Sequence, residues 1–233
     1  MRSARWLVAL TTAATLIITG APSGSAAAAP AGTRVAGLDL THATVLDLQR
    51  AMDRRRLTST ALTALYLARI RVLNPKLHAV IETSPDALRD AAISDLHRRR
   101  HGARGPLEGI PVLLKDNVDT ADRTRTTAGS LALAASRPAR DAFLVRRLRA
   151  AGAVILGKAN LSEWANFRST ESSSGWSARG GQTNNPYVLD RNACGSSSGS
   201  AAGVAASLAQ VAIGTETDGS IVCPSGTTGI VGV

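Results

Sequence analysis

The chain has 233 residues, of which 44% are apolar, and its 27 lysines and arginines outnumber 17 acidic residues. This length and apolar content are typical of a globular domain with one substantial core and exclude a disordered chain. The basic excess is spread over arginine-rich runs at 54–56, 98–100 and 146–149 without interleaved aromatic residues, which argues against a nucleic-acid-binding protein. We interpret these runs as solvated helix faces.

The first 29 residues differ from the rest of the chain. Two arginines precede an apolar run at 6–18, and small residues follow up to Ala29. The apolar run is shorter than the roughly 20 residues that a membrane-spanning helix needs. These features predict a cleaved signal peptide at 1–29, a mature domain at 30–233 and an exported protein, with an uncleaved membrane anchor as the alternative.

Beyond residue 40, segments with helical spacing of apolar residues alternate with short apolar strands. Asn74-Pro75 is expected to end the second helix, and Ser84-Pro85-Asp86 to begin the third. This alternation predicts an α/β fold, with a large mixed, mostly parallel sheet covered by helices on both faces. We expect helices at 44–54, 59–73, 84–100, 142–150 and 200–208, strands at 79–81, 154–156 and 209–213, a further buried strand ending at Lys115, and a long loop at 162–191.

Two glycine- and serine-rich loops, 192–203 and 214–220, flank the last helix and strand. A helix of about nine residues advances roughly 14 Å and a strand of about five returns roughly 16 Å, so Ser196 and Ser220 can be neighbours. Such loops expose backbone N–H groups to an anion, and a serine hydroxyl among them suggests acyl transfer. Phosphate binding and a flexible linker are the alternatives.

Lys115 is one of only three lysines in an arginine-rich chain. A lysine at the end of a buried strand can lose its proton at moderate pH, which arginine cannot do. Lys115 is therefore a candidate base, and a structural salt bridge to Asp116 or another acid is the alternative.

Cysteines and histidines give weaker signals. Cys194 and Cys223 can form a disulfide between the two loops, but we favour buried free thiols. His97 and His101 can share a helix face, yet no further ligand completes a metal site, so we expect solvated histidines.

Three motifs resemble the amidase signature family: GGQTNNP at 180–186, CGSSSGS at 194–200 and GTETDGSI at 214–221. The resemblance begins near Leu38 and extends to the last residue, and the run TDGSIVCP looks most like the bacterial peptide-amidase branch. It implies the amidase signature fold, truncated here before its C-terminal half. It also implies hydrolysis of a carboxamide through a Ser-Ser-Lys triad, without cofactor or metal.

The resemblance assigns the site residue by residue. Ser220 corresponds to the acyl-forming nucleophile, Ser196 to the bridging serine whose peptide bond is cis in the family, and Lys115 to the catalytic lysine. The backbone N–H groups of four consecutive residues would hold the oxyanion, and Thr170 resembles a pocket residue. The four oxyanion residues are Thr217, Asp218, Gly219 and Ser220.

Two positions depart from the family's pattern. Ala193 stands where relatives often have proline. Asp218 replaces a common glycine, so that a carboxylate either binds a substrate N–H or caps the turn.

The sequence therefore predicts a secreted serine amidase acting on a small-molecule or peptide amide, with no nucleic-acid partner and no membrane association after signal cleavage. A catalytically inactive truncated remnant or binding domain is the alternative from another class. An amidotransferase component is a weaker alternative, because of the export signal and the Thr217-Asp218 variant.

Export is directly testable. We expect cleavage between about Ala26 and Ala29, because the alanine-rich stretch after the apolar run suits signal peptidase. N-terminal sequencing of secreted material measures the cleavage point. An intact Met1 on membrane-bound protein would contradict the prediction.

Overall fold

The computed structural model describes residues 32–233, so the predicted signal peptide at 1–29 lies outside the described residues. Sixteen elements follow one another along this part of the chain. They are β1 (Arg34–Val35), β2 (Leu38–Asp39), α1 (Val45–Asp53), α2 (Ser59–Leu77), β3 (Val80–Thr83), α3 (Ala87–His101), β4 (Pro111–Lys115), the 3-10 helix η1 (Leu131–Leu133), α4 (Phe143–Ala150), β5 (Val154–Ala159), the 3-10 helix η2 (Glu163–Asn166), β6 (Trp176–Ser177), β7 (Gly181–Gln182), α5 (Ser198–Ala205), β8 (Val211–Ile213) and α6 (Val222–Thr228).

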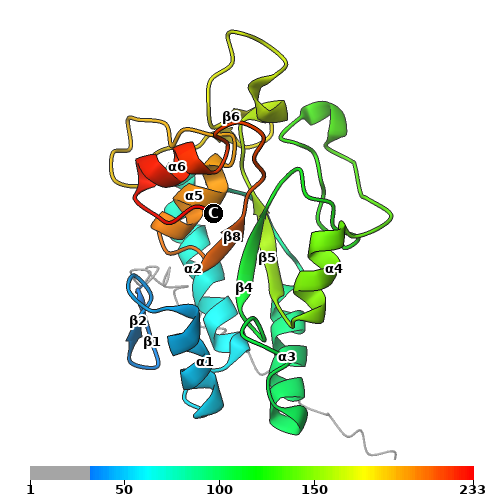
Figure 1. The fold of residues 1–233 in the computed structure, drawn as a ribbon, viewed down its shortest axis with the longest axis vertical. Helices are drawn as coiled ribbons and strands as arrows, with labels where there is room; N and C mark the ends of the chain where they lie inside the picture. Colours follow the sequence, from blue (N-terminus) through cyan, green and yellow to red (C-terminus); the bar gives the residue numbers. More distant parts are fainter. Residues whose placement is uncertain (1–31) are drawn as a thin grey trace, which may run out of the picture.

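The central sheet has the strand order β3-β5-β4-β8, of which β8, β4 and β5 are labelled side by side in Figure 1. β4 is parallel to both β5 and β8, whereas β3 is antiparallel to β5 at one edge. Two further antiparallel pairs, β1-β2 and β6-β7, are separate from this sheet. The expected α/β class with a mixed, mostly parallel sheet is confirmed.

Alternate side chains of β4 enter different cores because successive strand residues point to opposite faces. Leu113 belongs to the larger core, which also contains buried residues of α1, α2, α3 and α5. Val112 and Leu114 belong to a second core with Val145 and Leu148 of α4. Helices therefore cover both faces of the sheet, and both cores contain fully buried strand residues.

Three predicted helix boundaries are wrong. The helix expected at 200–208 is α5, which ends at Ala205. α2 continues through Pro75 to Leu77 and ends at His78 in the left-handed conformation. The Asn74 side chain makes two hydrogen bonds of 2.8 Å to the backbone of Val80, and Leu77 is buried in the core, so tertiary contacts hold the last turn despite the proline.

The third helix begins at Ala87 rather than at Ser84. Asp86 stands at its N-cap without a capping hydrogen bond, because Arg123 engages the carboxylate through Nε (3.0 Å) and Nη2 (2.6 Å). No helix is predicted after Ser220, where the structure has α6. No helix within residues 32–233 is both long and apolar enough to cross a bilayer.

Gly199 gives a test of how α5 packs on the sheet. A Cβ there would lie 2.2 Å from Ala79 O and 2.5 Å from Asn160 N, backbone atoms that cannot move aside. We expect Gly199→Ala to lower the free energy of unfolding by about 3 kcal/mol. Urea denaturation measures the change.

Gly226→Ala in α6 is the matched control, because its Cβ would meet no atom within 4 Å. It is expected to leave stability unchanged or raise it by about 0.5 kcal/mol, since alanine restricts the unfolded chain. Equal unfolding midpoints for the two variants would contradict this account of the packing.

Candidate active site

The site lies where parallel strands β4 and β8 end. Leu114 of β4 pairs with Ile213 of β8, so Lys115 and the loop that follows Ile213 leave the sheet at the same edge. α5 begins at Ser198 and is preceded by the loop that contains Ser196. The sheet thus brings together segments that are about 80 to 100 residues apart in sequence.

Lys115, Ser196 and Ser220 form a continuous chain of polar contacts. Lys115 Nζ lies 2.7 Å from Ser196 Oγ, and Ser196 Oγ lies 3.0 Å from Ser220 Oγ. The Gly195–Ser196 peptide bond is cis, as the resemblance implied. The structure therefore brings together all three residues that the sequence assigned to catalysis.

Lys115 is fully buried, and burial lowers its pKa to about 8. The Glu216 carboxylate acts in the opposite direction and raises it. Lys115 makes no ion pair within 4 Å to any acid of residues 32–233, so the geometry favours the candidate base over the salt bridge. A buried amine with a lowered pKa can be neutral near physiological pH.

Asp116, the acid next to Lys115 in the chain, has other partners. Its Oδ2 accepts hydrogen bonds from the Thr127 hydroxyl and from the Gly129 backbone, and Arg179 Nη1 lies 3.5 Å from its Oδ1. Burial raises the pKa of this carboxyl. Asp116 therefore fixes the loop at 127–129 rather than pairing with Lys115.

Lys158 is a second fully buried lysine that the sequence analysis did not single out. Burial also lowers its pKa to about 8. Its Nζ donates to Val118 O (2.6 Å) and Thr126 Oγ1 (2.9 Å). Lys158 lies on β5, and its amine contacts no serine hydroxyl. A lowered pKa therefore does not by itself distinguish Lys115 as the candidate base, whereas the contact of Lys115 with Ser196 does.

Glu216 organises the loop before Ser220, and the sequence analysis missed it. Its carboxylate accepts hydrogen bonds from the backbone N–H groups of Gly219 (3.0 Å), Ile221 (2.6 Å) and Val222 (2.9 Å). These hydrogen bonds lower the pKa of Glu216, and the bond from the Val222 N–H has the largest effect. An acid four residues before the serine, in a loop of otherwise mostly small residues, was the available signal.

This arrangement changes the expected oxyanion donors. The Gly219 N–H donates to Glu216, so it is not free for an oxyanion as predicted. Within residues 32–233, the N–H groups of Thr217, Asp218 and Ser220 have no hydrogen-bond acceptor. Those three donors remain open for a ligand.

Asp218 and Thr170 stand outside the polar chain of the site. The Asp218 side chain is exposed and bonds to none of the described residues, so Glu216 and not Asp218 holds the turn. Thr170 is exposed on the long loop at 162–191 and makes no hydrogen bond to the three candidate catalytic residues. The base of that loop does reach the site, because Ser162 N donates to Ser196 O at 3.0 Å.

The two serine loops are joined directly. Ser197 N donates to Ser220 O at 3.0 Å, and Cys194 and Cys223 form a disulfide with their Cα atoms 6.0 Å apart. Our expectation of free thiols is wrong, because the contact between the loops brings the two cysteines within bonding distance. Ala193 O also accepts a hydrogen bond from Thr227 Oγ1, which ties α6 to the first loop.

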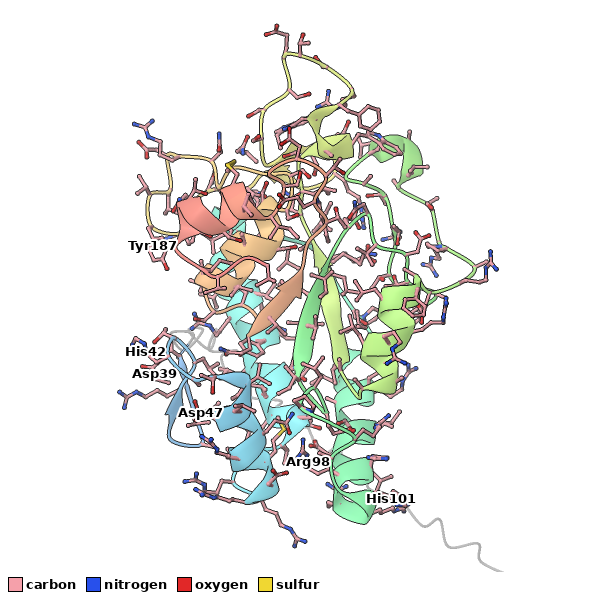
Figure 2. The ribbon with its side chains drawn as sticks, in the orientation of Figure 1. Asp39, His42, Asp47, Arg98, His101 and Tyr187 are labelled. Atoms are coloured by element: carbon pink, nitrogen blue, oxygen red, sulfur yellow. A yellow bond between two sulfur atoms is a disulfide. The ribbon has the colours of Figure 1, made fainter. Side chains whose placement is uncertain are left out.

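The histidine pair lies far from this site. Figure 2 shows Arg98 and His101 at the end of α3 opposite to α5 and α6. His101 is exposed as expected, whereas His97 is only partly so, with Nδ1 3.6 Å from the buried Glu108 carboxylate. No three His, Cys, Asp or Glu side chains in the described part of the chain converge as a metal site.

Comparison with known proteins identifies the family. The Amidase family profile matches residues 61–233. A probable amidase of Arabidopsis thaliana is 56% identical over 194 residues, which are 82% of this chain and 38% of that protein. A putative amidase of Schizosaccharomyces pombe is 47% identical over 84% of this chain and 34% of its own length. A glutamyl-tRNA(Gln) amidotransferase component from Moorella thermoacetica is 40% identical over 84% of this chain and 39% of that protein.

Solved structures agree in fold. The peptide amidase of Stenotrophomonas maltophilia is 62% identical, with a TM-score of 0.77 over 79% of this chain and 38% of that one. An amidase family protein of Bacillus anthracis is 44% identical, with a TM-score of 0.77 over 80% of this chain and 37% of that one. The chain thus spans less than two fifths of the length of these relatives. With the family profile, the relatives and the fold in agreement, the chain belongs to the amidase signature family.

Proposed function

We propose that the protein that contains this chain is a serine amidase that hydrolyses a carboxamide. The observation that carries the proposal is the relay from buried Lys115 Nζ through buried Ser196 Oγ to half-buried Ser220 Oγ, with steps of 2.7 and 3.0 Å. Both steps are within the range for proton transfer between positioned groups.

The relay suits acyl transfer. Neutral Lys115 takes a proton from Ser196 while Ser196 takes one from Ser220, whose oxygen attacks the carboxamide carbon. The open N–H groups of Thr217, Asp218 and Ser220 stabilise the oxyanion. When the C–N bond breaks, the proton returns through Ser196 to the leaving nitrogen, and an ester remains on Ser220. Water, deprotonated through the same relay, then releases the carboxylic acid and restores the Ser220 hydroxyl.

The comparisons support a choice between substrates. Identity is 62% with the peptide amidase and 40% with the amidotransferase component, and the chain contains the TDGSIVCP run, which resembles the peptide-amidase branch. We therefore propose a peptide C-terminal amide or a similar small carboxamide as the substrate. The basic and apolar pattern of residues 1–29 supports export of the enzyme.

Substitutions in the full-length protein test the three roles. Ser220→Ala is expected to abolish the acyl-enzyme, because no other group carries the ester. Ser196→Ala is expected to slow turnover by about two to four orders of magnitude. Lys115→Arg is expected to be nearly as damaging as Lys115→Ala, because a guanidinium stays protonated. Amide hydrolysis and labelling with a fluorophosphonate measure these effects.

Two results would contradict the mechanism: amidase activity retained in Lys115→Arg, or fluorophosphonate attached to Ser196 or Ser198 instead of Ser220. A wild-type protein that neither hydrolyses amides nor reacts with the probe would support the inactive alternative.

The rate of acylation is expected to depend on pH. Below the Lys115 pKa of about 8 the amine is protonated and cannot accept a proton, so the rate rises with pH through a midpoint near 8. Single-turnover acylation measured from pH 6 to 10 gives the midpoint. Lys115→Arg serves as the control, since its residual rate should lack this rise; a rise that persists in Lys115→Arg would assign the titration to another group.

A further inference from the structure

Lys115 has a second neighbour besides Ser196. Its Nζ lies 3.0 Å from Thr215 Oγ1 and 3.1 Å from Thr215 O. Thr215 comes two residues after the end of β8, so the parallel pairing of β8 with β4 places it beside the lysine. Both of its oxygens face the amine.

These contacts match the valence of a neutral amine. A neutral lysine has two N–H donors and one lone pair, and it acts as a base only where the lone pair faces the proton to be removed. Thr215 offers two acceptors, and Ser196 offers a hydroxyl. When Thr215 accepts both N–H groups, the lone pair is directed at Ser196.

We propose that Thr215 is a positioning residue that accepts both N–H groups of neutral Lys115 and thereby directs its lone pair at the Ser196 hydroxyl. The inference rests on the proposed amidase function and adds a residue to it. In this proposal Thr215 acts through Lys115.

The surroundings fix Thr215 in this orientation. Asn117 Nδ2 donates to Thr215 Oγ1 at 3.0 Å, and because Nδ2 only donates, it requires the hydroxyl oxygen to act as an acceptor. Thr215 N donates to Ser197 Oγ at 3.2 Å, and Ser197 Oγ in turn donates to Thr215 O at 3.2 Å. Thr215 is thus held by the residue after Ser196 and by the residue two after Lys115.

Few charges act on this amine. Glu216, from the loop after β8, raises the pKa of Lys115. Asp116, which follows β4, accepts hydrogen bonds from Thr127 and Gly129 and pairs with Arg179 instead of Lys115. Among the described residues, the contacts that orient Lys115 therefore come from uncharged oxygens.

Thr215→Val in the full-length protein removes one acceptor and keeps the shape. The plateau rate of fluorophosphonate labelling at Ser220 is expected to fall by about ten- to a hundredfold, because the lone pair loses its orientation. The midpoint of the pH dependence is expected to move to lower pH, because the protonated amine loses a hydrogen-bond acceptor more than the neutral one does. Thr215→Ser restores the acceptor and should restore both values.

Two further variants separate positioning from stability. Asn117→Ala, at an exposed position, removes the donor that orients Thr215 and should lower the plateau severalfold without unfolding the protein. Thr63→Val is the matched control, because its buried hydroxyl has no hydrogen-bond partner among the described residues. It should change neither plateau nor midpoint.

A second readout does not depend on activity. With carbon-13 labelling of the lysine Cε atoms in the full-length protein, the signal that is lost in Lys115→Ala reports Lys115. Its titration midpoint should fall in Thr215→Val and return in Thr215→Ser. An unchanged midpoint in a folded Thr215→Val protein overturns the inference, as does an unchanged labelling plateau.

Different results would refute the amidase function and the positioning role of Thr215. A wild-type protein that is not labelled at Ser220 contradicts the amidase function, and the Lys115 titration then still decides the contact with Thr215. A wild type that is labelled normally, with Thr215→Val identical to it, refutes the positioning role alone.

Discussion

The parallel pairing of β4 with β8 is the constraint on which the site depends. It sets Lys115 beside Thr215 at one edge of the sheet, and the same edge receives the loop that carries Ser220. Because β4 is buried on both faces, its last side chain is removed from water, and this desolvation lowers the pKa of Lys115. The position of the strand thus determines both where the amine is and how readily it loses its proton.

The loops around the strand ends are held by contacts with each other and with α6. The bond from Ser197 N to Ser220 O and the Cys194–Cys223 disulfide fix the second loop relative to the first, and the three backbone bonds to Glu216 fix the shape of the second loop itself. Proton transfer along hydroxyl groups requires contacts near 3 Å, and a small displacement of either loop would break the relay. This redundancy of contacts suits a site made from flexible, glycine-rich segments.

Lys115 and Lys158 are equally buried and differ in the oxygens that surround them. Both have a pKa lowered to about 8 by the same cause. Lys158 donates to a carbonyl and a threonine hydroxyl and anchors a loop, whereas Lys115 also contacts a serine that leads to a second serine. The oxygens around each amine, and not its pKa, separate a structural lysine from a candidate base.

The sequence alone determined the α/β class and most of the helix and strand positions, because periodicity is a local signal. Its motifs also singled out Lys115, Ser196 and Ser220, whose roles came from the resemblance to the amidase signature family. The sequence did not determine that α2 passes Pro75, that Asp86 pairs with Arg123, or that Cys194 and Cys223 are bonded. Nor did it reveal that Glu216 takes the Gly219 N–H or that Thr215 faces the lysine. Each of these depends on which groups meet across long separations in the chain. Spacing along a chain fixes what one segment can form, but only packing decides which donor finds which acceptor.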